Sequence, residues 1–416
     1  MFSLMTKLFP ICRSITGNGN RETLKIIQEI IPINIFEVES GTQVFDWTVP
    51  NEWNIKDAYV MNSKKEKIID FKKNNLHILN YSIPVNLTCN LEELKKHLYT
   101  LPNYPNFIPY LTSYYKNNWG FCISYNNYLK LKDDTYHVVI DSELKHGSLT
   151  YGELIIKGQT EQEILFSTYI CHPSMCNDCL SGIVVNTYLA KYILSLNNKY
   201  TYRFVFVPET IGSIVYLHKN LDIMKKNIIG GYTITCCGDN GDFTYMKTRL
   251  ENQLTDRVTL HVLNNSNIKF KIRDFMMAGS DERQYNYPNI DLNIGSLMRT
   301  KYQEFPEYHT SGDNLNFNSE KNLQETYDMY IKCINIFEHN DKYMVNTTCE
   351  PHLSKYGLHS DIGGNKIFND SSLILQFLYY CDGRDLLSIA EKIKIHIWNL
   401  YELSSTLLEK NIIKKI

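Results

Sequence analysis

Apolar and polar positions alternate along the middle of the chain in a regular rhythm of strands and helices. Strands are predicted at 163–170, 202–208 and 228–237, because each is a short and nearly continuous apolar run. Helices are predicted between them at 182–196 and 212–220. This alternation is typical of buried parallel strands that are joined by crossover helices. The segment therefore predicts a doubly wound α/β domain with a mostly parallel sheet.

Three further elements extend the predicted α/β domain. A strand is expected at 291–298, and a long amphipathic helix at 319–340 begins on Ser319, a residue type that caps helices. The early helical segment 17–31 is assigned to the same domain. In a doubly wound sheet the ligand site lies at the carboxyl ends of the strands, so we expect the chemistry in the loops that follow them.

The hydrophobic pattern changes on both sides of this domain. Short strands and turns without a strand–helix rhythm occupy 44–50, 58–70 and 78–86, which predicts a small β-rich inserted domain. Beyond residue 343 three compact helical segments suggest a winged-helix module. The predicted domains are the α/β domain at 1–37 and 126–342, the β-rich insertion at 38–125, and the winged helix at 343–416.

The amino-acid composition argues against a nucleic-acid-binding or membrane protein but does not identify the function. The 43 basic and 45 acidic side chains of this 416-residue chain are interspersed, so charge alone would not attract nucleic acid or an anionic membrane. No run approaches 18 uncharged apolar residues, and the first apolar stretch breaks at Lys7 and Pro10. We therefore expect a cytoplasmic protein without a membrane partner, and reduced thiols at the 11 cysteines.

Candidate metal ligands and bases follow the predicted strands. They are His172 and Asp178 after the first strand, Glu209 after the second, Asp239 after the third, and later Asp281, Glu282 and His309. Each could have a purely structural role when taken alone, such as a loop histidine or a helix cap. Together, histidines and carboxylates at adjacent strand ends suit zinc with an open position for water.

The cysteines of the stretch "STYICHPSMCNDCLSG" allow a competing interpretation. Cys171, Cys176 and Cys179 have the C-x4-C-x2-C spacing of a plant-type iron–sulfur protein, and Cys236 or Cys237 could add a fourth thiolate. An iron–sulfur cluster would leave the histidines and carboxylates of the same loops without a role. We therefore favour zinc and expect the cysteines to be packing residues.

The order of motifs resembles a known family. "CHPSMCNDCLSG", "FVFVPETIGS", "TCCGD", "GSDERQY" and "EYHTSGD" are similar to those of the zinc aminopeptidases with paired co-catalytic metals. The resemblance is greatest to a bacterial branch with an inserted β domain and a carboxyl-terminal winged helix. It implies that His172 is a zinc ligand and that Asp178 bridges two zinc ions. It also implies that His309 binds the other zinc and that Asp239 completes the first metal's shell.

One departure from the family concerns the second strand. The family has two adjacent glutamates there, one as general base and one as ligand, whereas here Glu209 lies between Pro208 and Thr210. We predict that Glu209 is the base, since activated water without a base gives much less rate. Asp281 or Glu282 could supply the missing ligand, or the site could hold a single zinc ion.

The function implied is hydrolysis of an amide by zinc-activated water. The substrate would be a small peptide, for an aminopeptidase, or a small amide such as an acylated amino sugar, for a deacylase. The related chains are often encoded among surface-polysaccharide genes, which favours the sugar. Tyr308 is predicted to stabilise the oxyanion, Glu282 to recognise a free α-amino group, and Arg283 either to bind a substrate carboxylate or to pair with nearby acids.

Two alternatives belong to other functional classes. In one, the α/β domain senses a ligand and the winged helix binds DNA, but residues 351–416 carry eight basic against seven acidic side chains, so we do not expect nucleic acid binding. Their apolar helices instead favour packing on the hydrolase or on a second subunit, which is where a homo-oligomer would form. In the other alternative, the missing glutamate marks an inactive hydrolase fold that serves as a scaffold.

Overall fold

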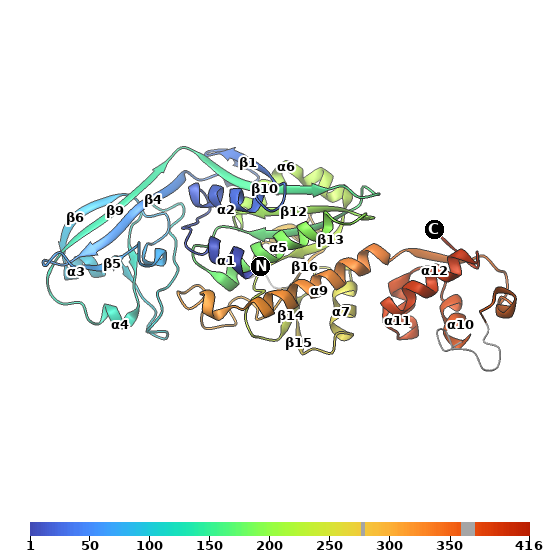
Figure 1. Cartoon of the computed structure of the whole chain (residues 1–416). Helices are drawn as coiled ribbons and strands as arrows, with labels where there is room; N and C mark the ends of the chain where they lie inside the picture. The colour runs from blue at the N-terminus through green and yellow to red at the C-terminus, as the bar shows by residue number, and fades with distance from the viewer. Residues whose placement is uncertain (276–278, 359–370) are drawn as a thin grey trace. The chain divides into compact units, whose positions relative to one another are not determined.

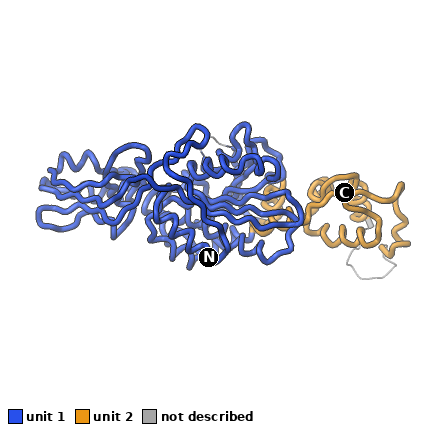
Figure 2. The backbone as a smooth tube through the Cα atoms, turned by 90° about the horizontal axis from the view of Figure 1, so that it is seen from above, with its two compact units in different colours: residues 1–256, 268–328 blue, residues 257–267, 329–416 orange. Residues whose placement is uncertain are grey.

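The structure is a computed structural model that describes residues 1–275, 279–358 and 371–416. The chain divides into two compact units (Figure 2). Unit 1 comprises residues 1–256 and 268–328, and unit 2 comprises residues 257–267 and 329–416. Each unit therefore combines segments that are distant in the sequence.

Unit 1 is built on an eight-stranded sheet whose centre is parallel (Figure 1). In spatial order its strands are β1 (Asn34–Glu39), β10 (Ser148–Ile156), β12 (Thr201–Val207), β11 (Glu163–Tyr169), β13 (Ile228–Thr233), β16 (Ile294–Met298), β14 (Phe243–Met246) and β15 (Phe270–Arg273). β12, β11, β13 and β16 pair in parallel, whereas β1, β10 and β14 join by antiparallel pairing. Every residue of β11 and β12 is buried, as expected of strands covered on both faces. The predicted doubly wound, mostly parallel sheet is confirmed.

Helices cover both faces of this sheet. They are α1 (Phe2–Leu8), α2 (Asn18–Gln28), α5 (Ser181–Ile193), α6 (Ile211–Asn227) and the short α8 (Glu282–Tyr285). α6 packs on the face that carries Val205 and Val207. α5 lies on the other face, where a Cβ on Gly182 would be 2.6 Å from Thr168 Oγ1, because successive residues of a strand point to opposite faces. α6 continues beyond its predicted end at residue 220.

The polar interval after residue 237 contains elements that the hydrophobic pattern does not reveal. They are β14, β15 and α7 (Leu254–Asn264). β14 and β15 have four residues each, and no residue of β15 is buried. Neither strand therefore produces the apolar run on which a prediction from sequence depends.

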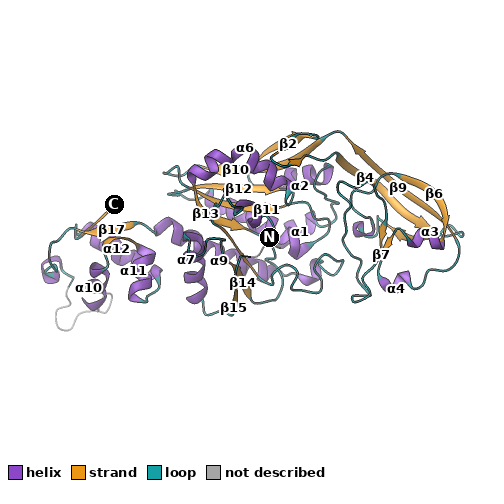
Figure 3. Ribbon diagram, turned by 180° about the vertical axis from the view of Figure 1, so that it is seen from behind, coloured by secondary structure: helices purple, strands orange, loops and turns teal. Residues whose placement is uncertain are grey.

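The predicted β-rich insertion forms a lobe of unit 1 (Figure 3). Its four-stranded sheet has the order β5 (Lys67–Asp70), β4 (Glu52–Met61), β9 (Thr135–Lys145), β6 (Val85–Asn90). Two short strand pairs accompany this sheet, β2 (Gln43–Val44) with β3 (Trp47–Thr48) and β7 (Leu98–Tyr99) with β8 (Phe121–Cys122). The lobe also contains the helices α3 (Leu91–Lys95) and α4 (Tyr125–Tyr128) and the 3₁₀ turn η1 (Asn75–His77). The boundary at residue 125 stays a prediction, and the lobe's sheet itself runs on to the end of β9.

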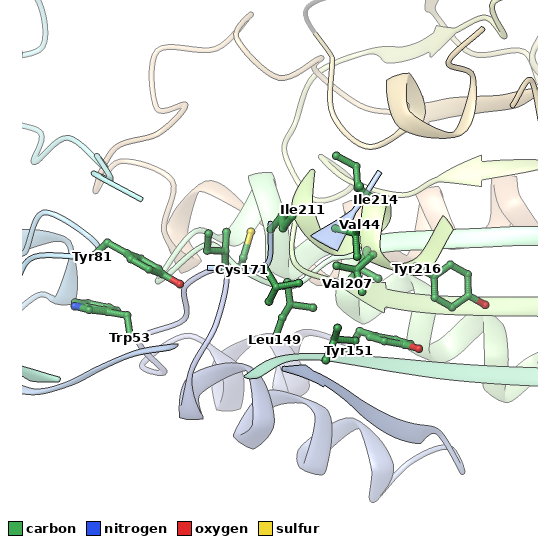
Figure 4. Close-up of a cluster of buried hydrophobic side chains, with 14 of the residues drawn as sticks. Val44, Trp53, Tyr81, Leu149, Tyr151, Cys171, Val207, Ile211, Ile214 and Tyr216 are labelled. Atoms are coloured by element: carbon green, nitrogen blue, oxygen red, sulfur yellow. The ribbon is translucent and has the colours of Figure 1, made fainter. Parts of the chain in front are cut away.

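The hydrophobic core of the lobe is continuous with that of the α/β sheet (Figure 4). Trp53 and Tyr81 of the lobe stack with ring centroids 5.8 Å apart. The same buried cluster includes Cys171, which follows β11, and Val207 at the end of β12. Because close-packed cores resist displacement, this continuity fixes the lobe beside the carboxyl ends of the central strands.

Unit 2 contains the predicted winged helix. A three-stranded antiparallel sheet has the order β18 (Asp382–Asp385), β17 (Lys342–Val345), β19 (Ile413–Lys415). The accompanying helices are α10 (Ser371–Tyr379), α11 (Leu386–Ile393), α12 (Tyr401–Glu409), and the 3₁₀ turns η4 (Leu353–Tyr356) and η5 (Ile397–Leu400). α9 (Glu320–His339), the predicted long helix, begins in unit 1 and ends in unit 2, and Ser319 Oγ accepts the Asn322 amide as its predicted cap. Residues 359–370 of the predicted domain lie outside the described residues.

No helix among the described residues is long and apolar enough to cross a membrane.

Candidate metal centre

The first two candidate loops lie next to each other at the carboxyl edge of the sheet. β11 and β12 are parallel neighbours and end at Tyr169 and Val207, so the loops that follow them start at the same edge. His172 lies in the loop after β11, and Glu209 follows β12 by two residues. Glu209 Oε2 is 3.6 Å from His172 Nε2. Parallel pairing therefore explains why these two residues meet.

Asp178 and His309 complete a group of three candidate ligands. One ligand atom each of His172, Asp178 and His309 lies within 4.8 Å of the others. Asp178 belongs to the π-helical turn η2 (Cys176–Leu180), which precedes α5. His309 comes from the loop before α9, where its φ is 52°, and its Nε2 is 2.9 Å from Asp178 Oδ2. Three of the four predicted metal ligands thus converge.

The carboxylate of Asp178 is held from one side and open on the other. Its Oδ1 accepts a hydrogen bond of 2.5 Å from the Tyr169 hydroxyl, and its backbone amide donates to Asp313 Oδ2 at 2.9 Å. Oδ2 is buried and has no hydrogen bond with any described residue, although the imidazole of His309 lies beside it. Since buried acceptors normally have a partner, an acceptor facing two imidazoles fits a cation between them.

The pKa values of His172 and Asp178 are both lowered, for different reasons. Desolvation lowers the pKa of His172 to about 4, so its imidazole is neutral at pH 7, as metal binding requires. Burial raises the pKa of Asp178, but the adjacent imidazoles of His309 and His172 outweigh it and the net shift is downward. Both side chains therefore have the protonation state of a metal ligand at neutral pH.

Glu209 is more exposed than His172 and Asp178, and its pKa is shifted upward. Its side chain is 25% exposed, whereas that of His172 is 2% exposed. Its Oε1 accepts a hydrogen bond of 2.9 Å from Ser280 Oγ. Desolvation, followed by the charges of Asp281 and Asp178, raises the pKa of Glu209 well above its ordinary value. The carboxyl therefore holds its proton more tightly than an exposed glutamate does.

Cys171 joins Glu209 in a second potential group. Atoms of Cys171, His172 and Glu209 also lie within 4.8 Å of one another, and Cys171 Sγ accepts the Glu209 amide at 3.2 Å. The iron–sulfur alternative has no geometric support, because the described residues contain no ligand group with Cys171, Cys176 and Cys179 together. Burial raises the pKa of Cys179 to about 12, which disfavours the thiolate that a cluster needs.

Asp239, the fourth predicted ligand, belongs to neither potential ligand group among the described residues. Its carboxylate is 1% exposed and accepts four hydrogen bonds. The donors are the Gly241 amide, the amide and hydroxyl of Thr300, and the side-chain amide of Asn177. A carboxylate has about four acceptor positions, so protein donors saturate Asp239 and leave no lone pair for a metal.

The "GSDERQY" acids, considered as substitutes for the missing ligand, have other partners. Asp281 Oδ1 accepts the Thr210 amide at 2.7 Å and the Ser213 hydroxyl at 2.9 Å, so it caps α6. Burial raises the pKa of Asp281 to about 7. Glu282 is 1% exposed, and its Oε1 accepts the Tyr302 hydroxyl at 2.7 Å. Neither acid belongs to a potential ligand group among the described residues.

The remaining predicted residues lie around the group in different ways. The Tyr308 ring stacks on the His309 imidazole, with centroids 3.9 Å apart. Arg283 Nη2 donates to Thr210 Oγ1 at 3.1 Å, so it holds the side chain of the residue next to Glu209. The burial of Glu282 gives no support to its predicted contact with a substrate amine.

The inserted lobe contributes a residue that no sequence pattern singles out. The Tyr110 ring centroid is 5.3 Å from those of both His172 and His309. The Tyr110 amide donates to His309 O at 2.8 Å, and the Ser311 amide donates to Ile108 O at 2.8 Å. A strand-like contact between two loops thus places a lobe tyrosine against both imidazoles. The local sequence "FIPYL" contains no motif from which this contact could be predicted.

Comparison with known proteins extends this picture. Residues 2–340 match the family described as "Domain of unknown function (DUF4910)", and residues 341–415 match a winged helix-turn-helix family. A protein of Clostridium acetobutylicum named "Putative polysaccharide biosynthesis protein with aminopeptidase-like domain" is 51% identical over 395 residues. The match covers 94% of this chain and 91% of that protein.

Solved structures share the fold at two levels of similarity. A crystal structure of a "putative peptidase" from Clostridium acetobutylicum has 48% identity and a TM-score of 0.94, and covers 100% of this chain and 96% of that one. A zinc aminopeptidase from Bacillus subtilis has 12% identity and a TM-score of 0.58, and covers 81% of this chain and 94% of that one. The chain therefore belongs to the DUF4910 family and joins an aminopeptidase-like α/β fold to a C-terminal winged helix, as the resemblance of its motifs predicted.

Proposed function

We propose that this protein is a zinc-dependent hydrolase of amide bonds. The observation that carries the proposal is the convergence of ligand atoms from His172, Asp178 and His309 within 4.8 Å, with Glu209 3.6 Å from His172. Two imidazoles and one carboxylate form a donor set that zinc prefers, with a fourth position left for substrate or water. A bound zinc ion would supply a Lewis acid and lower the pKa of water.

A single zinc ion fits these residues better than a pair. Protein donors saturate Asp239, so the second carboxylate for a paired site would have to be Glu209. A site that used Glu209 as a ligand would have no base next to His172. We therefore assign Glu209 to proton transfer and the other three residues to the metal.

Glu209 has the properties of a general base. Burial and the neighbouring carboxylates raise its pKa, which makes it a stronger base than an ordinary glutamate. The hydrogen bond from Ser280 to Oε1 fixes the carboxylate and leaves Oε2 on the side of His172. Glu209 would accept a proton from the attacking water and return it to the leaving amine, while the Tyr308 hydroxyl would donate to the oxyanion.

The substrate class is proposed as a small amide. Tyr110 covers both imidazoles from the lobe side and is 6% exposed, which favours a compact substrate over a folded protein. The name of the Clostridium acetobutylicum relative joins polysaccharide biosynthesis to an aminopeptidase-like domain. This supports N-acylated amino sugars as substrates to be tested beside aminoacyl amides.

Metal analysis combined with an amide screen tests the proposal. Protein purified without added metal or chelator should contain about one equivalent of zinc and hydrolyse at least one of two probes, an aminoacyl p-nitroanilide or N-acetylglucosamine. His309→Ala should lose zinc and activity together. His146→Ala, which removes an exposed imidazole of the lobe, is the matched control and should retain both. Zinc-loaded protein without turnover on either probe would favour the inactive scaffold instead.

A further inference from the structure

A cavity of about 680 Å³ lies in unit 1, apart from the metal centre. Its walls come from the segments 10–22, 53–56 and 141–143 together with Phe71. None of the metal-centre residues described above lines it. Its volume falls within the range of roughly 300–1,000 Å³ that is typical of sites for small molecules.

The backbone beside this cavity is closely packed at two glycines and irregular in one strand pair. Gly17 has φ +100°, and a Cβ on it would lie 2.2 Å from Trp53 O. A Cβ on Gly19 would lie 2.1 Å from Cys12 O. The pairing of β4 with β9 shifts register between residues 55 and 57, beside the cavity. Bulges of this kind are over-represented next to functional sites, where they redirect side chains.

A buried hydroxyl on the cavity wall lacks a partner. Ser14 is 2% exposed and lines the cavity, and its Oγ has no hydrogen bond with any residue that the structure describes. The Asn20 side chain, which is fully buried and does not line the cavity, donates to Ser14 O and so holds the backbone that carries this hydroxyl. Buried polar atoms normally find partners, so this wall is suited to a ligand that donates and accepts hydrogen bonds.

The charges of the lining select against anions. Three carboxylates line the cavity, on Glu22, Asp141 and Glu143, against one ammonium group, on Lys56. Glu143 is 2.9 Å from Lys145, whereas no ion pair within the described chain engages Glu22 or Asp141. A ligand with a phosphate or carboxylate would meet like charges here, and a ligand with an ammonium group would meet opposite charges.

The remaining walls are apolar. Ile11 is 8% exposed, and Ile55 and Phe71 are half-buried. The lining therefore combines carboxylates and a free hydroxyl with an aliphatic and aromatic surface. A ring with hydroxyls on its rim, C–H groups on its face and one amine matches both surfaces.

We propose that this cavity is a second ligand site that takes a polyhydroxylated amine, such as an amino sugar. Ser14 Oγ would pair with a ligand hydroxyl, Glu22 and Asp141 would attract the ammonium group, and Phe71 would pack against the ring face. This assignment does not depend on the amide hydrolase activity, because the lining excludes the metal centre.

Calorimetric titration of the full chain with D-glucosamine tests the site. Glucose 6-phosphate and glucose serve as the anionic and neutral probes. We expect glucosamine to bind with a Kd about tenfold below that of glucose 6-phosphate, with glucose between them. The double variant Glu22→Gln and Asp141→Asn should raise the glucosamine Kd about fivefold, since an exposed ion pair contributes up to about 1 kcal/mol.

Two control variants test whether glucosamine binds at this cavity. Asp133→Asn removes one exposed carboxylate of the lobe outside the cavity and should leave the Kd unchanged. Glu209→Gln changes the metal centre and should leave it unchanged as well. Absence of glucosamine binding, tighter binding of glucose 6-phosphate, an unchanged Kd in the double variant, or loss of binding in Glu209→Gln would each overturn the proposal.

Discussion

Replacement of Glu209 by glutamine is the sharpest test of how the proposed centre works. Glutamine has nearly the same size, and its side-chain oxygen can still accept the hydrogen bond that Ser280 Oγ makes to Oε1 at 2.9 Å. The position 3.6 Å from His172 Nε2 therefore stays filled. The change removes the negative charge of the carboxylate and with it the ability to take up a proton.

The magnitude follows from the role of a base. Proton transfer by a positioned side chain contributes roughly 10²–10⁴-fold to rate, which corresponds to about 2.7–5.4 kcal/mol in the activation free energy. We expect kcat of Glu209→Gln to fall by that factor with KM little changed. Because the base must be deprotonated and its pKa is raised, wild-type kcat/KM should increase with pH through that pKa. The variant should lose this limb of the profile.

The assay measures kcat, KM and bound zinc on the same preparations, with the amide probe that the wild type hydrolyses. Ser280→Ala is the matched control, since it frees the Glu209 carboxylate without neutralising it. Its kcat should fall much less, by about tenfold, because the base is still present but less well positioned. Zinc lost from Glu209→Gln would identify Glu209 as a ligand, and a kcat close to that of the wild type would show that it is not the base.

Three further changes probe the surroundings and the stability of unit 1. Tyr169→Phe removes the hydrogen bond to the Asp178 carboxylate and should weaken zinc binding about 10–100-fold in chelator competition. Arg203→Met leaves Glu163 buried without its ion pair of 2.5 Å and should destabilise by about 3–5 kcal/mol in urea unfolding, while adding Glu163→Met should restore much of the loss. Arg21 lowers the pKa of Glu52 to about 2 from 4.5, so their pairing stabilises fully above pH 4.5 and is lost as the pH falls toward 2. Thermal melts between pH 5 and 3 should therefore be less pH-dependent in Glu52→Gln, and a dependence equal to the wild type's would contradict this.

The sequence predicted the central part of the fold because local burial is encoded locally. The fully buried strands β11 and β12 leave uninterrupted apolar runs, and parallel pairing then forces their loops to one edge. His172 and Glu209 were found from that rule alone. The short strands β14 and β15 escaped it, because four residues give no distinguishable period.

The convergence of His309 on Asp178 had a different origin. It followed from the resemblance to the zinc aminopeptidases, since nothing in the local pattern joins two residues so far apart. The structure supports the ligand roles that the resemblance implied for His172, Asp178 and His309, because their ligand atoms lie within 4.8 Å of one another. It does not support the ligand role that the resemblance implied for Asp239, although this residue also follows a strand of the same sheet.

The sequence by itself determined which residue types stand at the strand ends, and hence where a site of histidines and carboxylates was to be expected. Tertiary structure alone decided which of them remain available. Donors from distant loops, such as that of Thr300, occupy the acceptor positions of Asp239, whereas Asp178 Oδ2 accepts no hydrogen bond and lies 2.9 Å from His309 Nε2. Tyr110 reaches the imidazoles only because the lobe core is continuous with the sheet core. The physical reason is that hydrophobic periodicity records the burial of each element against its neighbours, while the competition of polar groups for partners depends on every loop that arrives at the same place.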